Sequence, residues 1–163
     1  MRIWNERPTE IAHLFNPAFC SLLLRDGIMG FTEQSQNGMP YPLIFLLLPI
    51  VLHKNTRETL PKSLATKMHP WLQQNEEVKI GFSDRCAAIT GYTREAILFG
   101  VAGTLFRFSS DLTLQAPPLR LPPLAWPRDS EPVICRQRAR FVGKWLATAG
   151  DVTTIFATWG ILP

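Results

Sequence analysis

Hydrophobic side chains follow one another almost without interruption from Pro42 to Leu52, and no other segment of the chain is apolar on every side. A bilayer, the domain core or a partner protein must therefore cover this segment. It is about half as long as the roughly 20 apolar residues that a bilayer-spanning helix needs. We expect a helix in the domain core, with a kink or a stop near Leu46–Leu48 because Pro49 removes a backbone donor. The excess of leucine leaves a contact with a partner open.

Apolar residues also recur at helical spacing elsewhere, after a short amphipathic turn that begins at Pro8. The first long helix is expected to start at Asn16-Pro17, where asparagine caps the helix, and to end at Gly27. Residues 26–39 are rich in Gly, Asn, Gln and Ser and have no period, which predicts a surface loop. Further helices are expected over 56–60, 63–72, 76–89, 94–105, 133–149 and 152–159.

The middle of the chain, over about 75–116, predicts a winged helix. Asn75 is expected to cap one helix, and the segment from Thr90 to Thr93 is expected to form a tight turn into a second. Two short strands, around the turn at 109–111, then predict a β-hairpin. Helix, turn, helix and hairpin in this order is the layout of a winged helix.

Six prolines between residues 116 and 132 exclude a helix or a central strand there and predict an extended connector. Apolar residues such as Leu121 and Trp126 indicate that the connector lies pinned across the domain surface. The predicted fold class is therefore mainly α (α+β), in a single domain over 1–163. A C-terminal helical pair over 133–160 follows the connector.

The net charge of +4 and the isoelectric point near 9.3 permit contact with nucleic acid or with an acidic protein, without requiring either. Cys20, Cys86 and Cys135 are odd in number and far apart. This pattern predicts reduced thiols and a cytoplasmic location, not a disulfide framework. Residues 1–8 have no apolar segment behind their charges, so no export signal is expected.

The sequence contains no recognisable catalytic or metal-binding pattern. Its histidines have no cysteine or carboxylate at ligand spacing, and His53, beside Lys54 at a helix end, is expected to cap a helix or face its dipole. Gly100 and Gly103 follow no strand, so they do not predict a phosphate-binding loop. We therefore predict no metal, no cofactor, no small-molecule substrate and no enzymatic activity.

The helix after Arg94 lacks the outward-facing polar side chains that base recognition requires. It is apolar on more than one side, so we expect it to contact a protein through Ile97 and Phe99, together with Arg107 of the hairpin. Arg107 and Asp111 nearly cancel in charge, so contact between the hairpin and phosphate would be weak.

A basic stripe runs along the helix over 133–149, because Arg136, Arg140 and Lys144 are four residues apart and Arg138 extends the set. A solvated cationic face on a packed helix is one interpretation. The other is a docking stripe for acidic side chains or for a phosphate backbone.

Several motifs, spread over nearly the whole chain, resemble those of a known family of small bacterial proteins. They are Asn16-Pro17-Ala18, the apolar run 42–54 with 56–61, the segment 95–100, the segment 138–145 and the C-terminal 159–163. The family is the middle component of three-component ABC systems.

This resemblance implies a non-enzymatic protein encoded between an ABC ATPase of the SMC or Rad50 type and an effector, in systems directed against phages and other invading DNA. Proteins in the same position of related machines are often winged-helix subunits that bind the ATPase, an analogy at the level of fold.

The resulting hypothesis is a soluble adaptor that bridges an SMC/Rad50-like ATPase and an effector. The alternative is a sequence-independent DNA-binding protein that uses the basic stripe. A third hypothesis is a membrane-peripheral protein that docks through Leu43–Leu52.

Overall fold

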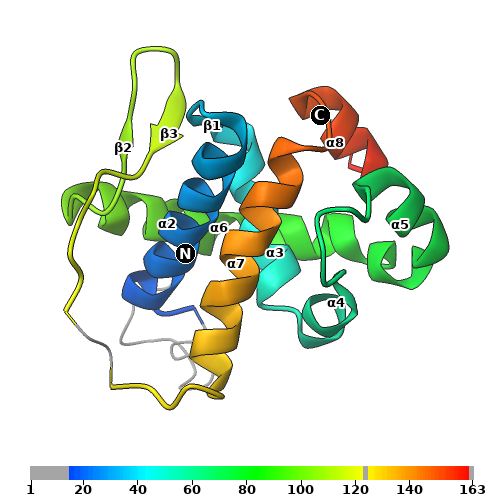
Figure 1. The fold of residues 1–163 in the computed structure, drawn as a ribbon, viewed down its shortest axis with the longest axis horizontal. Coiled ribbons are helices and arrows are strands. Elements are labelled where there is room, and N and C mark those ends of the chain that lie inside the picture. Colours follow the sequence, from blue (N-terminus) through cyan, green and yellow to red (C-terminus); the bar gives the residue numbers. More distant parts are fainter. Residues whose placement is uncertain (1–14, 123–124, 162–163) are drawn as a thin grey trace.

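The structure, a computed structural model, describes residues 15–122 and 125–161 of the chain (Figure 1). The turn predicted from Pro8 lies outside these residues, apart from Phe15 at its end. The described elements are α2 (Pro17–Ser35), β1 (Met39–Pro40), the 3-10 helix η2 (Tyr41–Leu43), α3 (Ile44–Val51), α4 (Lys54–Thr59), α5 (Met68–Gln74), the 3-10 helix η3 (Glu76–Lys79), α6 (Phe82–Ala102), β2 (Arg107–Phe108), β3 (Thr113–Gln115), α7 (Glu131–Ala147) and α8 (Val152–Thr158).

Helix α3 forms the centre of the core, as the apolar run predicted. It packs against α2, α6 and α7, and every one of its residues except Phe45 is buried. Of the kink or stop predicted near Leu46–Leu48, the stop is wrong, because α3 continues to Val51 with Pro49 inside it. The burial of seven of its eight residues outweighs the local cost of proline. No helix in the described part of the chain combines the length and hydrophobicity needed to cross a bilayer. Leu43 and Leu46–Leu48 are at most 1% exposed, so these four leucines offer almost no surface to a membrane or a partner.

Helices α2 and α7 lie side by side in front of α3 (Figure 1). The predicted helix end at Gly27 and most of the predicted loop over 26–39 are wrong, because α2 runs on to Ser35. Gly27 serves a close helix contact instead of a turn. A Cβ atom on Gly143 of α7 would lie only 1.9 Å from the carbonyl oxygen of Gly27. The left-handed residue that ends α2 is Gln36, with φ of 63°.

Helix α6 is continuous, so the predicted helix-turn-helix is wrong. No turn occurs between Thr90 and Thr93, and the helix begins after Gly81, whose φ is 64°, rather than at Asn75. Its buried residues, from Phe82 to Gly100, share one face that continues on both sides of the Gly91 position, and this packing outweighs the cost of about 1 kcal/mol for glycine in a helix. Thr93 does not cap, since its hydroxyl donates to the carbonyl oxygen of Ile89 at 3.2 Å.

The predicted hairpin is confirmed, and it belongs to a small antiparallel sheet with the order β1-β3-β2. Met39 of β1 pairs with Leu114 of β3, an additional contact that the sequence did not predict. A winged helix is not confirmed, because the hairpin follows one long helix and not two.

The connector and the C-terminal helices complete the molecule. Pro117 accepts a hydrogen bond from Arg25 of α2 at 3.1 Å, and Trp126 packs edge-on against Phe19 with ring centroids 5.9 Å apart. Helices α7 and α8 are close to the predicted segments, and the Thr154 amide donates to the Asp151 cap at 2.7 Å.

Candidate protein-docking surface

Helix α6 has an inner face that belongs to the core and an outer face that residues 15–122 and 125–161 leave uncovered. Ala96, Ile97 and Gly100 point inward and are buried, whereas Leu98 is 72% exposed and Phe99 is 48% exposed. The apolar side chains from Ile97 to Val101 surround the helix, and the core can cover only one side of it. The remaining side chains therefore face solvent.

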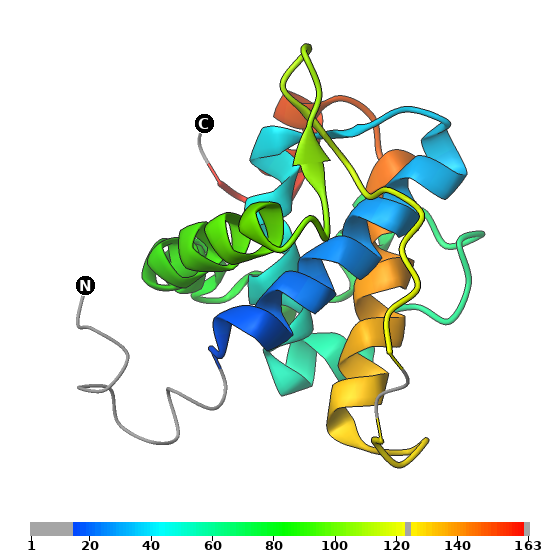
Figure 2. The same cartoon turned by 90° about the vertical axis from the view of Figure 1, so that its left-hand side faces the viewer.

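Gly100, near the end of α6, packs closely against Phe106, just before the hairpin begins. A Cβ atom on Gly100 would lie 2.3 Å from the ring of Phe106, which is fully buried. The Leu105 amide donates to the Gly100 carbonyl oxygen at 2.8 Å, so the chain turns back directly beneath the helix. The hairpin therefore rises from the C-terminal end of α6 (Figures 1 and 2).

The tip of the hairpin is held by hydrogen bonds around Asp111. The Thr113 hydroxyl donates to its Oδ1 at 2.9 Å, the Ser109 hydroxyl also donates to Oδ1, and these bonds lower the pKa of Asp111. Leu112 follows with φ of 59°, a left-handed conformation that is uncommon for a non-glycine residue, and it is 72% exposed. A large apolar side chain is thus presented to solvent by a strained backbone.

These exposed residues form what we call the α6–hairpin surface: Leu98, Phe99, Val101, Phe108 and Leu112. Phe108 is supported from behind by Tyr41, with ring centroids 5.4 Å apart. Arg94 and Arg107 are exposed beside this surface, and the described residues provide neither of them with an ion pair. The surface is therefore apolar, with two arginines at its edge and the Asp111 carboxylate, to which Ser109 and Thr113 donate, at the hairpin tip.

Of the three docking residues predicted for this region, Phe99 and Arg107 are exposed, while Ile97 is 5% exposed and lies in the core. The sequence analysis did not identify the other members of the surface as docking residues: Leu98, Val101, Phe108 and Leu112. The uninterrupted apolar run in the second half of α6 was the available signal, since such a run leaves part of the helix uncovered.

The predicted basic stripe faces α2 and is largely paired with it. Arg136 binds Asp26 through two hydrogen bonds, of 2.6 and 3.1 Å. Arg140 donates to Glu33, and the ammonium group of Lys144 lies 3.1 Å from the same carboxylate.

These two partners, Arg140 first, lower the pKa of Glu33. Arg138 instead points to the other side and donates to the Pro61 carbonyl oxygen at 3.3 Å.

A polar cleft of about 440 Å³ lies beside the hairpin, between the end of α2 and the connector. Thr32, Arg107, Asp111 and Gln115 contribute to its walls. It contains no histidine or cysteine, and the described residues hold no group of His, Cys, Asp and Glu that could bind a metal. Burial raises the pKa of Cys20 and of Cys86 each to about 12, which disfavours their nucleophilic thiolate forms.

The family model for the ABC-three component (ABC-3C) system Middle Component 3 matches residues 4–163. The chain belongs to this family. Neither a curated protein nor a solved structure matches it. The resemblance to the middle component of three-component ABC systems is thereby confirmed, and an exposed apolar surface is a feature that a component of a multi-protein system would use.

In this Middle Component 3 protein, the prominent exposed feature of the described residues is the apolar α6–hairpin surface. Its apolar outer face is built on a long helix and a hydrogen-bonded hairpin, both anchored to the core. Such anchoring reduces the conformational entropy that would be lost on binding, because the backbone that carries these side chains is already ordered.

Proposed function

We propose that this chain is a non-enzymatic adaptor that binds another component of its three-component ABC system through the α6–hairpin surface. The single observation that carries the proposal is the exposure of Leu112 at 72% on a left-handed backbone. The positive φ belongs to the hairpin turn, in which the Leu112 amide donates to the Ser109 carbonyl oxygen at 3.1 Å. The isolated fold gains nothing from an exposed leucine there, where glycine or asparagine would be less strained, so a contact outside the chain is the simplest reason for the leucine.

The partner that fits this surface has an apolar centre and an acidic edge. Apolar side chains form the fully buried part of most stable interfaces, and complementary charges at the rim speed association. Arg94 and Arg107 would meet that acidic edge. The SMC/Rad50-like ABC ATPase implied by the family resemblance is our candidate, with the effector bound elsewhere on the adaptor.

We extend the proposal to the biological role that the resemblance implies, which is defence against phages and other invading DNA. The alternative, a DNA-binding protein that uses the α7 stripe, has less support. Arg136, Arg140 and Lys144 already pair with carboxylates of α2, so fewer counterions would be released on binding phosphate there.

The test is co-purification of the chain with the ATPase and the effector encoded beside it. Leu98→Asp and Leu112→Asp should each weaken capture of the partner by about tenfold or more, because each places a charge in an apolar contact. Ile80→Asp is the matched control, since Ile80 is 77% exposed but lies outside the surface. Equal capture by all three variants, or no capture by the unaltered chain, would contradict the proposal.

A further inference from the structure

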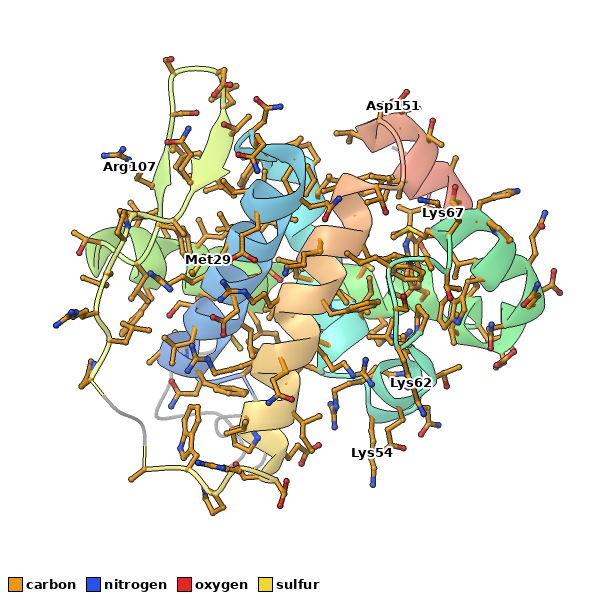
Figure 3. The ribbon with its side chains drawn as sticks, viewed as in Figure 1. Met29, Lys54, Lys62, Lys67, Arg107 and Asp151 are labelled. Atoms are coloured by element: carbon orange, nitrogen blue, oxygen red, sulfur yellow. The ribbon has the colours of Figure 1, made fainter. Side chains whose placement is uncertain are left out.

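A second surface lies on the side of the molecule opposite the hairpin. Figure 3 places Lys54, Lys62 and Lys67 along α4 and the connection to α5, whereas Arg107 lies at the other edge. We call these three exposed residues the lysine ridge. Residues 53–69 contain four Lys and Arg residues but a single carboxylate, Glu58.

The charge of the lysine ridge is poorly neutralised. Glu58 lies 3.9 Å from the ammonium group of Lys54, and both side chains are more than 60% exposed, so this ion pair is weak. No ion pair reaches Lys62 or Lys67 from the described residues. The ridge therefore differs from the α7 stripe, where three of the cations pair with carboxylates of α2.

The loop that carries Lys62 and Lys67 has no regular secondary structure, but hydrogen bonds attach it to α7. The Trp145 indole donates to the Thr66 carbonyl oxygen at 2.8 Å, and Arg138 of α7 donates to that of Pro61. Pro61 and Met68, at the two ends of the loop, are buried. The lysines are thus displayed from a fixed backbone, together with the exposed residues Ser63 and Thr66.

We propose that the lysine ridge binds the phosphate backbone of double-stranded nucleic acid without reading its sequence. Lysine ammonium and Ser or Thr hydroxyl groups are the usual protein contacts to phosphate oxygens. Arg138 adds a fourth cation at the base of the loop.

Two features favour nucleic acid over an acidic protein, and a duplex over a single strand. None of the large hydrophobic side chains exposed in the described residues lies between residues 53 and 69, so the ridge lacks the apolar centre of a protein interface. The same stretch contains no Phe, Tyr or Trp, so it lacks the large aromatic side chains on which successive unpaired bases stack.

The experiment measures fluorescence anisotropy of a labelled 20-base-pair DNA duplex of arbitrary sequence, from low to physiological salt, with the full chain. A duplex RNA and a single-stranded DNA of equal length form two further arms. The triple variant Lys54→Gln, Lys62→Gln and Lys67→Gln should weaken duplex binding by about tenfold or more at low salt. It should also reduce the slope of log affinity against log salt by about 2 to 3.

Two controls separate local contact from net charge. Replacing Lys79, Arg120 and Arg128 by Gln changes the net charge equally and should alter affinity by less than about twofold. Replacing the three ridge lysines by Arg should preserve binding. Equal losses in both Gln variants would overturn the proposal. So would a wild-type chain that binds no duplex, that prefers single-stranded DNA, or that binds polyglutamate as tightly as DNA.

Discussion

Leu112 is an exposed leucine at a backbone position where another residue would make the fold more stable. At a φ of 59°, asparagine or glycine is the usual choice, because a longer side chain crowds the backbone. We predict that Leu112→Asn raises the free energy of unfolding by about 0.5–1 kcal/mol and at the same time weakens partner capture. Urea unfolding and the co-purification assay measure the two effects.

Leu119→Asn is the control for this trade-off, because Leu119 is 40% exposed and has no positive φ. Its stability should change by less than about 0.5 kcal/mol. A Leu112→Asn protein that is less stable than the wild type would show that Leu112 serves the isolated fold after all.

His53 is a second residue whose environment has a measurable consequence. It caps α4, with the Thr56 amide donating to its Nδ1 at 3.3 Å, which requires a neutral ring. Burial, then Arg85 and Arg57, lower the pKa of His53 below its ordinary 6.5. The unfolded chain therefore binds more protons between the folded pKa and 6.5, so the contribution of His53 is complete above pH 6.5 and is lost as the pH falls.

His53→Asn should keep the cap but lose this pH dependence, because asparagine is a good cap that does not titrate. We expect the stability of the wild type to fall more steeply than that of the variant as the pH drops below 6.5, by no more than the ~1 kcal/mol of a cap. Urea titrations at several pH values measure the difference. Parallel curves would mean that His53 is not linked to folding.

At the scale of elements, the ion pairs between α2 and α7 differ in burial, and we expect their contributions to stability to differ in the same order. Asp26 is only 5% exposed and binds Arg136 through two hydrogen bonds, whereas Glu33 lies at the exposed end of the same contact. We predict that Asp26→Asn costs about 2–3 kcal/mol, since it leaves an arginine partly buried without its partner. Glu33→Gln should cost less than about 1 kcal/mol. Chemical denaturation of the two variants compares them directly, and equal losses would contradict the grading.

The elements also show how far a single sequence predicts this fold. The apolar run at 42–52 gave the core helix correctly, and turn residues at 109–111 gave the hairpin. Gly27 and Gly91 are both predicted to form turns, but both lie inside helices. For Gly27 the reason is that glycine at a close helix contact looks the same in sequence as glycine at a turn. Only the partner surface, such as the Gly143 backbone against Gly27, distinguishes the two cases.

The candidate sites illustrate the same limit. Phe99 and Arg107 are exposed, as docking requires, but the spacing of the basic stripe does not reveal its partners. The predicted loop over 26–39 kept Asp26 and Glu33 away from a common helix face. Once α2 continues to Ser35, the two carboxylates lie seven residues apart on one helix face and meet α7. Which charges remain exposed is thus a tertiary property, decided by helix pairing.

At the scale of the whole molecule, the α6–hairpin surface and the lysine ridge lie on opposite sides of one core (Figures 1 and 3). One surface is apolar with cations at its edge, and the other is cationic with few apolar groups. Two partners of different chemistry could therefore bind together, which is the geometry an adaptor requires.

We accordingly predict that duplex DNA and the protein partner bind simultaneously and without competition. In an anisotropy titration with labelled duplex, adding the purified partner should raise the plateau signal, because the complex becomes larger, without releasing DNA. Leu98→Asp should remove the added increment and retain DNA binding, whereas the Gln variant of the ridge lysines should lose the DNA and still capture the partner. Displacement of DNA by the partner would show that the two surfaces are not independent, since no direct overlap is expected across the width of the core.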